Sequence, residues 1–158
     1  FHTDPSTIAP PRVPTLVHAF QGFVDAGGGV RQAADHIRET CTTELVAAFD
    51  SDELLDYRAR RPRMTFSSDH FSAVESSRLE VNRVVDAEGR DFFLLDGPEP
   101  DYQWNRFLAA VDLLVDEFGL SHAVGLTAIP WPAPHKTLAA GTLAVSAFLS
   151  GIFFLQAI

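Results

Sequence analysis

The sequence predicts a mixed α/β fold in which a largely parallel sheet is flanked by helices. The first observation is an apolar run at residues 16–20, which has the length of a buried strand and is followed by a glycine-rich turn at residues 26–29. Behind this turn, apolar residues recur at the spacing of one helix face. The second observation is that the same order returns later, where an apolar run at residues 92–95 precedes an amphipathic segment. Strand, turn and helix in this order form the first half of a β-α-β unit.

The first helix is expected to begin just after Asp25 and the glycines that follow it. Its apolar face consists of Val30, Ala33, Ala34, Ile37 and Cys41. In one interpretation, the Asp25 carboxylate accepts hydrogen bonds from free N–H groups of the helix, which stabilises a helix by about 1 kcal/mol. In the other, the loop cradles an anion or a nucleotide at the positive end of the helix dipole. The loop matches no known phosphate-binding motif.

Later segments continue the alternation of strands and helices. Residues 45–49 predict a second strand that neighbours the first and runs parallel to it. The acidic residues after Asp50 predict one or two helical turns, and residues 67–77 are polar and turn-like. Residues 79–85 predict a strand that a turn joins to the apolar run at 92–95.

The clearest helix of the sequence follows that run. One apolar stripe persists through Trp104, Phe107, Leu108, Val111, Leu114, Val115 and Phe118. Gly119 then ends the helix, residues 123–126 predict another strand, and residues 129–136 form a proline-rich loop.

We predict an extended lead-in at residues 1–14, which contain four prolines, and a single α/β domain at residues 15–158. Residues 138–158 carry no charged side chain. We interpret them as a buried strand and helix of the domain core. A membrane-spanning tail is the alternative, although no basic cluster flanks the segment and polar residues interrupt it.

Composition narrows the choice of partners and compartment. The net charge is −9, which disfavours nucleic acid as a partner. The single cysteine, Cys41, cannot form an internal disulfide, and no signal peptide is visible, so we expect a cytoplasmic location.

Several polar residues follow predicted strand ends, where they can converge on one crevice. Asp25, Asp50, Asp96, Glu99, Asp101 and His135 form this set. Carboxylates with a histidine suit a hard cation or acid–base chemistry, but helix caps and turns use the same residue types. We therefore predict no catalytic residues, no metal and no cofactor. The candidate ligand-binding residues are Gly22, Asp25, Gly27, Asp96, Glu99 and His135.

A cluster of arginines lies between residues 58 and 61. These side chains can bind an anionic ligand. The interpretation that we favour is that they pair with Asp50, Asp52 and Asp56, where exposed ion pairs contribute little stability.

Four stretches together resemble the proteasome assembly chaperone 2 family, in particular its actinobacterial members. They are AFQGFVDAGGGV, FDSDELLDYRARRP, LLDGPEPDYQWNRF and GLTAIPWPAPHK, in that order along the chain. The resemblance implies an architecture related to nucleoside phosphorylases and a homo-oligomer, with trimers known in the family. It also implies a function that is defined for eukaryotic members, which help to build the proteasome core, and is undefined for many bacterial ones.

Three features depart from the family pattern. The family's Trp-Asn-Asp-Ala-Gly is Phe23-Val24-Asp25-Ala26-Gly27 here, and its Pro-His-Thr-Arg is residues 134–137, Pro-His-Lys-Thr. The chain ends in Gln-Ala-Ile without the docking tail of proteasome-binding chaperones. The family domain also extends further than the segment after Lys136, so we expect the C-terminal part to be incomplete or diverged.

The leading hypothesis is a non-enzymatic protein-binding or assembly module that associates with itself and with proteasome-related proteins. The alternative is a small-molecule-binding or hydrolytic enzyme that uses an acidic crevice at the strand ends. Nothing in the sequence names a reaction.

Overall fold

The computed structural model describes residues 2–3, 15–23 and 25–129. The predicted lead-in at residues 1–14, apart from residues 2–3, lies outside the described residues, as do the uncharged segment at 138–158 and His135. No helix among the described residues has both the length and the apolar character needed to cross a membrane.

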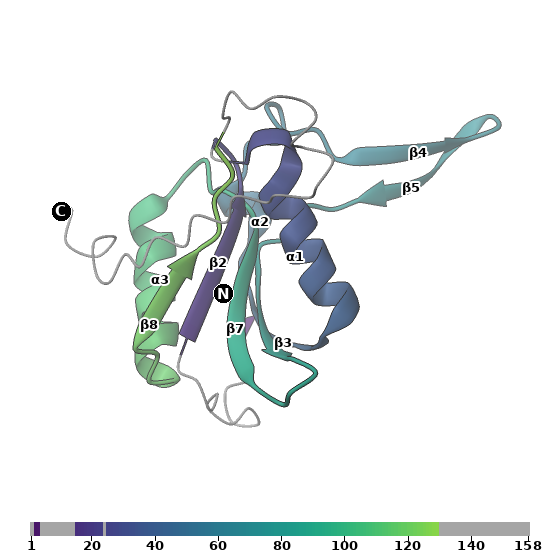
Figure 1. Cartoon of the computed structure of the whole chain (residues 1–158). Helices are drawn as coiled ribbons and strands as arrows, with labels where there is room; N and C mark the ends of the chain where they lie inside the picture. The colour runs from purple at the N-terminus through teal and green to yellow at the C-terminus, as the bar shows by residue number, and fades with distance from the viewer. Residues whose placement is uncertain (1, 4–14, 24, 130–158) are drawn as a thin grey trace.

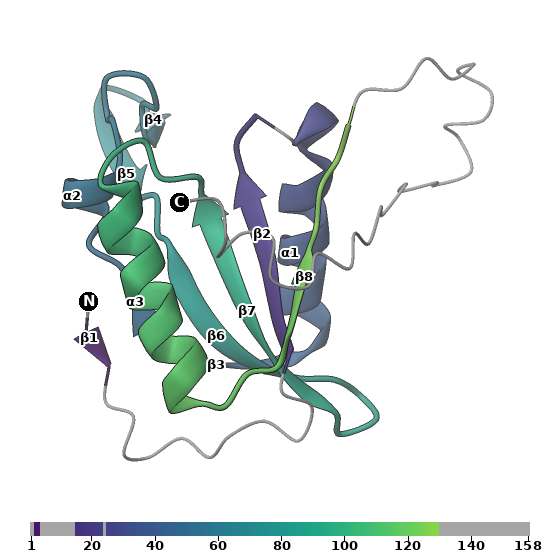
Figure 2. The same ribbon diagram turned by 90° about the vertical axis from the view of Figure 1, so that its left-hand side faces the viewer.

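A mixed sheet forms the centre of the described structure (Figure 2). Its strands, in spatial order, are β1 (His2–Thr3), β3 (Thr42–Ala48), β6 (Glu80–Val85), β7 (Asp91–Pro98), β2 (Thr15–Gln21) and β8 (His122–Gly125). β2 is parallel to β7 and to β8, and the other pairs are antiparallel. As a result β2, β3, β7 and β8 all point the same way. The predicted mixed α/β fold is confirmed.

Helices cover both faces of the sheet. On one face, α3 (Trp104–Glu117) contributes Phe107 and Leu114 to a core with Phe93 and Leu95. On the other face, α1 (Gly29–Thr40) contributes Val30 and Ala34 to a core with Leu94. The alternation of residues 93–95 between the two cores follows from the two-residue period of a strand. Phe93 and Leu94 are fully buried.

The position of β3 corrects one prediction. Residues 45–49 were expected to neighbour the first strand, but β6 and β7 lie between β3 and β2. A tight turn in which Asp86 N–H and Arg90 C=O bond at 2.9 Å makes β6 and β7 a hairpin, and this hairpin inserts between them. An apolar run indicates a buried strand but carries no information about its neighbours.

β7 also extends further than the sequence indicated. Asp96, Gly97 and Pro98 were expected to lie beyond the strand because they are turn-forming residue types, yet they pair with Ala19, Phe20 and Gln21 of β2. The ladder with β2 therefore overrides local turn propensity. Asp96 lies inside the sheet and not past its end.

The third difference is a hairpin that projects from the body (Figure 1). Residues 67–77 were expected to be turn-like, but β4 (Arg63–Ser67) and β5 (His70–Glu75) pair antiparallel as a separate two-stranded sheet. Serines and charged residues hide the alternation of apolar side chains in this stretch. The short helix α2 (Ser51–Leu54), by contrast, lies where it was predicted.

Candidate functional site

The candidate residues that the structure describes lie at or near the end of the sheet where β2, β3, β7 and β8 finish and β6 begins. This end also carries the loops that lead into α1, α2 and α3. Sequence segments that are far apart therefore meet here, as expected for the crevice side of an α/β sheet.

Asp25 contacts the start of α1. Its Oδ1 accepts a hydrogen bond of 2.7 Å from the backbone N–H of Val30, in the first turn of the helix. Gly27 and Gly28 have φ values of 65° and 72°, a left-handed conformation that favours glycine and turns the chain into the helix. On the opposite side, Ala26 N–H donates to Ala128 C=O at 2.8 Å. Asp25 and Gly27 thus shape the entry into α1.

Asp25→Ala is expected to lower the free energy of unfolding by about 1 kcal/mol, because the Val30 N–H loses its acceptor. Urea denaturation followed by circular dichroism measures this change. Asp35→Ala is the matched control, since Asp35 is exposed inside the same helix and its carboxylate accepts no hydrogen bond from the described residues. An equal loss in both variants would attribute the effect to charge and contradict the capping role.

Gly22 and Glu99 lie against each other. Glu99 Oε2 accepts a hydrogen bond of 3.3 Å from the Phe23 N–H. A methyl group on Gly22 would overlap this carboxylate oxygen and would lie 2.8 Å from Glu99 Cβ. Glycine at this position therefore allows the loop after β7 to approach the loop after β2.

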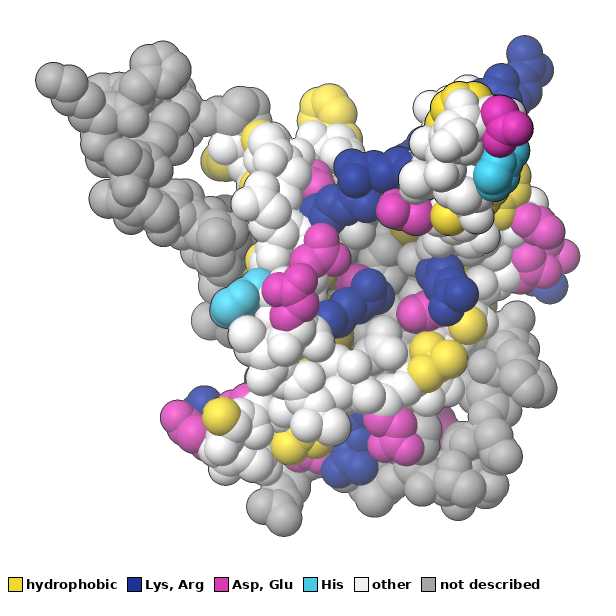
Figure 3. All heavy atoms as spheres, turned by 90° about the vertical axis from the view of Figure 1, so that its right-hand side faces the viewer, with side chains coloured by type: hydrophobic (Ala, Val, Ile, Leu, Met, Phe, Trp, Pro, Cys, Tyr) yellow, Lys and Arg dark blue, Asp and Glu magenta, His cyan; other side chains and the backbone are white. Residues whose placement is uncertain are grey.

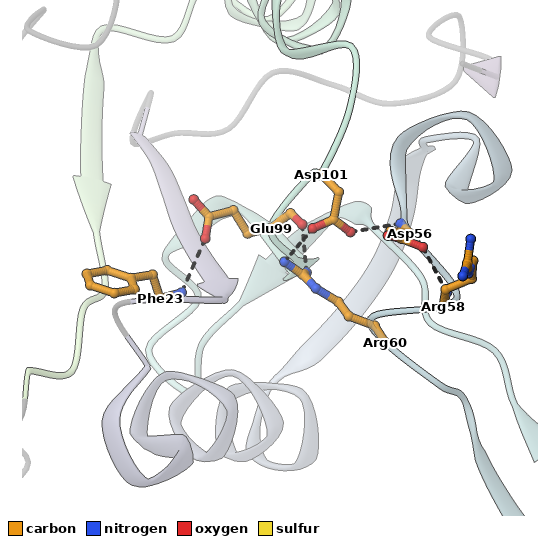
Figure 4. Close-up of polar contacts among 6 residues, drawn as sticks. All are labelled: Phe23, Asp56, Arg58, Arg60, Glu99 and Asp101. Atoms are coloured by element: carbon orange, nitrogen blue, oxygen red, sulfur yellow. Dashed lines mark hydrogen bonds and ion pairs between the residues drawn. The ribbon is translucent and has the colours of Figure 1, made fainter.

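Arg60 links these loops to a third one (Figure 4). Its guanidinium donates to the Glu99 carbonyl oxygen at 2.7 Å and pairs with Asp101 Oδ1 at 3.0 Å. The second oxygen of Asp101 accepts the Asp56 N–H at 2.8 Å, and Asp56 Oδ1 accepts the Arg58 N–H at 2.8 Å. Hydrogen bonds to the Asp56 carboxylate hold its pKa below the usual value, the largest contribution coming from the Arg58 N–H. This loop network joins three of the four sequence stretches quoted above.

The network corrects the predicted arginine pairing. Arg60 pairs with Asp101, while Asp50 caps α2 through the Asp52 N–H at 3.0 Å and Asp52 accepts the Tyr57 hydroxyl at 2.7 Å. Within the described part of the chain, neither Arg58 nor Arg61 forms an ion pair with these aspartates. The error arose because proximity in sequence was taken for proximity in space.

Asp96 is buried on the α1 side of the sheet. Its side chain is 1% exposed, and Arg38 Nη2 lies 2.8 Å from Oδ1 and 2.7 Å from Oδ2. Only the contact to Oδ1 has hydrogen-bond geometry, so Oδ2 remains without a directional donor. Burial raises the pKa of Asp96 to about 6, although the Arg38 charge opposes this rise.

A polar pocket of about 390 Å³ opens beside Asp96. Six arginines from several elements line it: Arg31, Arg38, Arg60, Arg61, Arg63 and Arg78. Figure 3 views this face, where dark blue side chains gather around a hollow below the hairpin. We call this hollow the arginine pocket. The sequence pointed only to the arginines between residues 58 and 61, because the others come from segments that meet only after folding.

The structure therefore distributes the candidate residues over three places. Gly22 and Glu99 meet each other, Asp25 and Gly27 form the start of α1, and Asp96 lines the arginine pocket. His135 lies outside the described residues. Among the residues that the structure describes, no three His, Cys, Asp or Glu side chains are grouped closely enough to hold a metal ion.

The chain is similar to several known proteins. The family model of the PAC2 family matches residues 19–147. An unknown-function protein of Mycobacterium tuberculosis, Rv2714, is 46% identical over 82% of this chain and 47% of its own, with a TM-score of 0.77. An unknown-function protein of Corynebacterium glutamicum is 34% identical over 86% of this chain and 49% of its own, with a TM-score of 0.74. No curated protein matches the chain significantly.

A more distant structure extends the likeness of the fold. The proteasome-assembly chaperone homologue Rv2125 of Mycobacterium tuberculosis is 23% identical over 77% of this chain and 52% of its own, with a TM-score of 0.67. This chain spans about half the length of the solved relatives that it matches. The family model covers the strand ends and loops that build the site described above. Because it matches most of the sequence, the chain belongs to the PAC2 family.

Proposed function

We propose that this chain is a non-enzymatic protein-binding module that associates with copies of itself through one face of the β4–β5 hairpin. The apolar side chains of that face carry the proposal. Met64 and Phe66 share one side of β4, and their cross-strand partners are Val74 and Phe71. Each of the four is between 48% and 60% exposed. The rings of Phe66 and Phe71 contact edge to face, with centroids 5.2 Å apart.

An isolated two-stranded hairpin is at best marginally stable in water. This hairpin pairs with no other strand among the described residues and projects from the body (Figure 1). Burying one large apolar side chain contributes about 1.5–3 kcal/mol, so covering four half-exposed ones stabilises an interface by several kcal/mol. Contact with a partner protein would supply the stabilisation that the hairpin does not receive from the main sheet.

A second copy of the chain fits this face. An apolar face packed on its own copy forms a self-complementary interface, which is the commonest kind in homo-oligomers. The charged residues of the hairpin are Arg63, Asp69 and Glu75, so the hairpin carries little of the net charge of −9. Association through the hairpin would therefore keep the acidic main domains of two copies apart and limit their charge repulsion. The family resemblance also favours a homo-oligomer. A self-complementary hairpin contact by itself closes a dimer, whereas the trimers known in the family would need a head-to-tail contact between two different surfaces.

The candidate carboxylates support a binding role more than a hydrolytic one. Asp25 accepts a helix N–H, Glu99 accepts the Phe23 N–H, and Asp96 pairs with Arg38. Each is engaged in holding the fold.

Proteasome-related proteins are the second partner class that we propose, because one relative with the same fold is described as a proteasome-assembly chaperone homologue.

Sedimentation equilibrium of the wild type and of Phe66→Ser/Phe71→Ser tests self-association. The wild type should form a defined oligomer, and the double variant should raise its dissociation constant about a hundredfold. Leu113→Ser is the control, because Leu113 is 63% exposed on α3, away from the hairpin, and should leave the mass unchanged. Both phenylalanines are exposed, so the variants should keep the circular dichroism spectrum of the wild type.

A wild type that stays monomeric, or a double variant with unchanged affinity, would refute the proposal. Light scattering after mixing with proteasome core subunits tests the second partner class. A mass increase with the wild type that Phe66→Ser/Phe71→Ser abolishes would support a shared surface.

A further inference from the structure

We infer that the arginine pocket binds a small molecule with at least two anionic oxygen groups, such as phosphates or carboxylates. This inference does not depend on self-association through the hairpin. It rests on the charge, the shape and the composition of the pocket.

The charge of the pocket is opposite to that of the chain. Its charged lining consists of six arginines, Arg31, Arg38, Arg60, Arg61, Arg63 and Arg78, and four acids, Asp35, Glu75, Glu80 and Asp96. The chain as a whole has 21 acidic and 12 basic residues. A local excess of positive charge in such a protein attracts anions, and the low-dielectric walls of a concave site strengthen this attraction.

Three of these six arginines have no acidic partner among the residues that the structure describes. Arg38 pairs with Asp96 at 2.7 Å, Arg60 with Asp101 at 3.0 Å, and Arg78 with Glu80 at 3.7 Å. Within the part of the chain that the structure describes, Arg31, Arg61 and Arg63 form no ion pair. Their guanidinium groups remain available to a ligand.

These three arginines come from separate parts of the fold. Arg31 lies in the first turns of α1, Arg61 in the loop before the hairpin, and Arg63 at the first position of β4. A guanidinium recognises a carboxylate or phosphate through two parallel hydrogen bonds, so several guanidiniums suit a ligand with more than one anionic group. A volume of about 390 Å³ is in the range of small-molecule sites.

The pocket also connects the hairpin to the body. Pro62 before β4, Glu75 at the end of β5 and Ser77 just after β5 line it together with Arg31 and Arg38 of α1. A dianion that contacts Arg31 on α1 and Arg61 or Arg63 at the hairpin base would bridge the two. Ligand binding should therefore slow hydrogen exchange in residues 63–75.

Calorimetric titration of the full chain with pyrophosphate, citrate and a short polyglutamate peptide, at constant ionic strength, tests the inference. Pyrophosphate or citrate should bind at one site per chain and should slow exchange in the hairpin. Arg31→Gln/Arg61→Gln should weaken this binding by at least about tenfold. Arg58→Gln is the matched control: Arg58 is exposed, forms no ion pair among the described residues and does not line the pocket.

Three results would overturn the inference. The first is that the wild type binds neither pyrophosphate nor citrate. The second is an equal loss of affinity in Arg58→Gln, which would attribute binding to overall charge. The third is that the polyglutamate peptide binds more tightly than both small anions, which would indicate an acidic protein segment as the natural ligand. Circular dichroism of both variants verifies that they fold.

Discussion

Gly97→Ala is expected to lower the free energy of unfolding by more than about 3 kcal/mol, a large part of the stability of an ordinary domain. Gly97 lies in β7 with a φ of 138°, a region that is almost restricted to glycine and costs other residues about 1–3 kcal/mol. A methyl group there would also overlap the carbonyl oxygen of Arg78 and would lie 2.8 Å from Leu79 Cα.

Both neighbours in this collision belong to the backbone, so no side-chain rotation relieves it. The start of β6 must move away from β7, which disturbs the pairing of Glu80 with Asp96 and the buried Leu79. Since Gly97 and Arg78 also line the arginine pocket, the same movement should reduce anion binding.

Urea denaturation measures the effect against Gly119→Ala. Gly119 also has a positive φ, 59°, but a methyl group on it would meet nothing within 4 Å. The control therefore carries the strain of a left-handed backbone without any collision and should lose only about 1–2 kcal/mol. Equal losses in the two variants would mean that β6 accommodates the methyl group easily, contrary to the geometry.

Asp96→Asn is expected to gain stability relative to the wild type as the pH rises from about 4 to about 7. In the folded protein, burial raises the pKa of Asp96 from its usual 3.8 to about 6. The folded state then holds the proton more tightly than the unfolded state does. The stabilising contribution of the protonated carboxyl is complete below about pH 4 and is lost as the pH rises through about 6.

A pKa difference of about two units corresponds to about 3 kcal/mol of stability at neutral pH. Three neighbours modify the burial effect: Arg38 lowers the pKa, whereas Glu80 and Asp35 raise it. The side chain is 1% exposed, so solvent screens the charge only weakly. Asparagine has nearly the same shape and carries no charge, so it lacks this pH dependence.

Urea midpoints of both proteins between about pH 4 and pH 7 measure the difference. Asp86→Asn is the control, because hydrogen bonds from the Arg90 and Glu88 N–H groups and the Arg90 charge lower the pKa of Asp86. Its stability difference from the wild type should stay nearly constant above about pH 5. A constant difference for Asp96→Asn as well would mean that Arg38 fully offsets the burial of the carboxylate.

Much of the fold was predictable from the sequence because its signals are local. The period of apolar residues indicated α1 and α3, and the short apolar runs indicated β2, β7 and β8. Asp25 was recognised as a candidate cap because a capping side chain bonds the free N–H groups of the helix that directly follows it. Such features depend on neighbours within a few residues in the chain.

The tertiary structure decided which segments meet. Asp96 and Gly97 are turn-forming residue types, so the sequence predicted the end of the strand before them. Their pairing with β2 places them inside β7. The β4–β5 hairpin, whose apolar face supports our functional proposal, was not predicted because serines and charged residues interrupt its apolar alternation in the sequence. The arginine pocket joins α1 to the base of that hairpin, residues that no spacing rule connects.

The elements, the α/β class and the resemblance to a family were therefore predictable, since each rests on short-range patterns. The strand order, the burial of Asp96 and the convergence of the arginines become visible only in the folded protein. These depend on contacts between distant residues, which one sequence does not encode in any local signal.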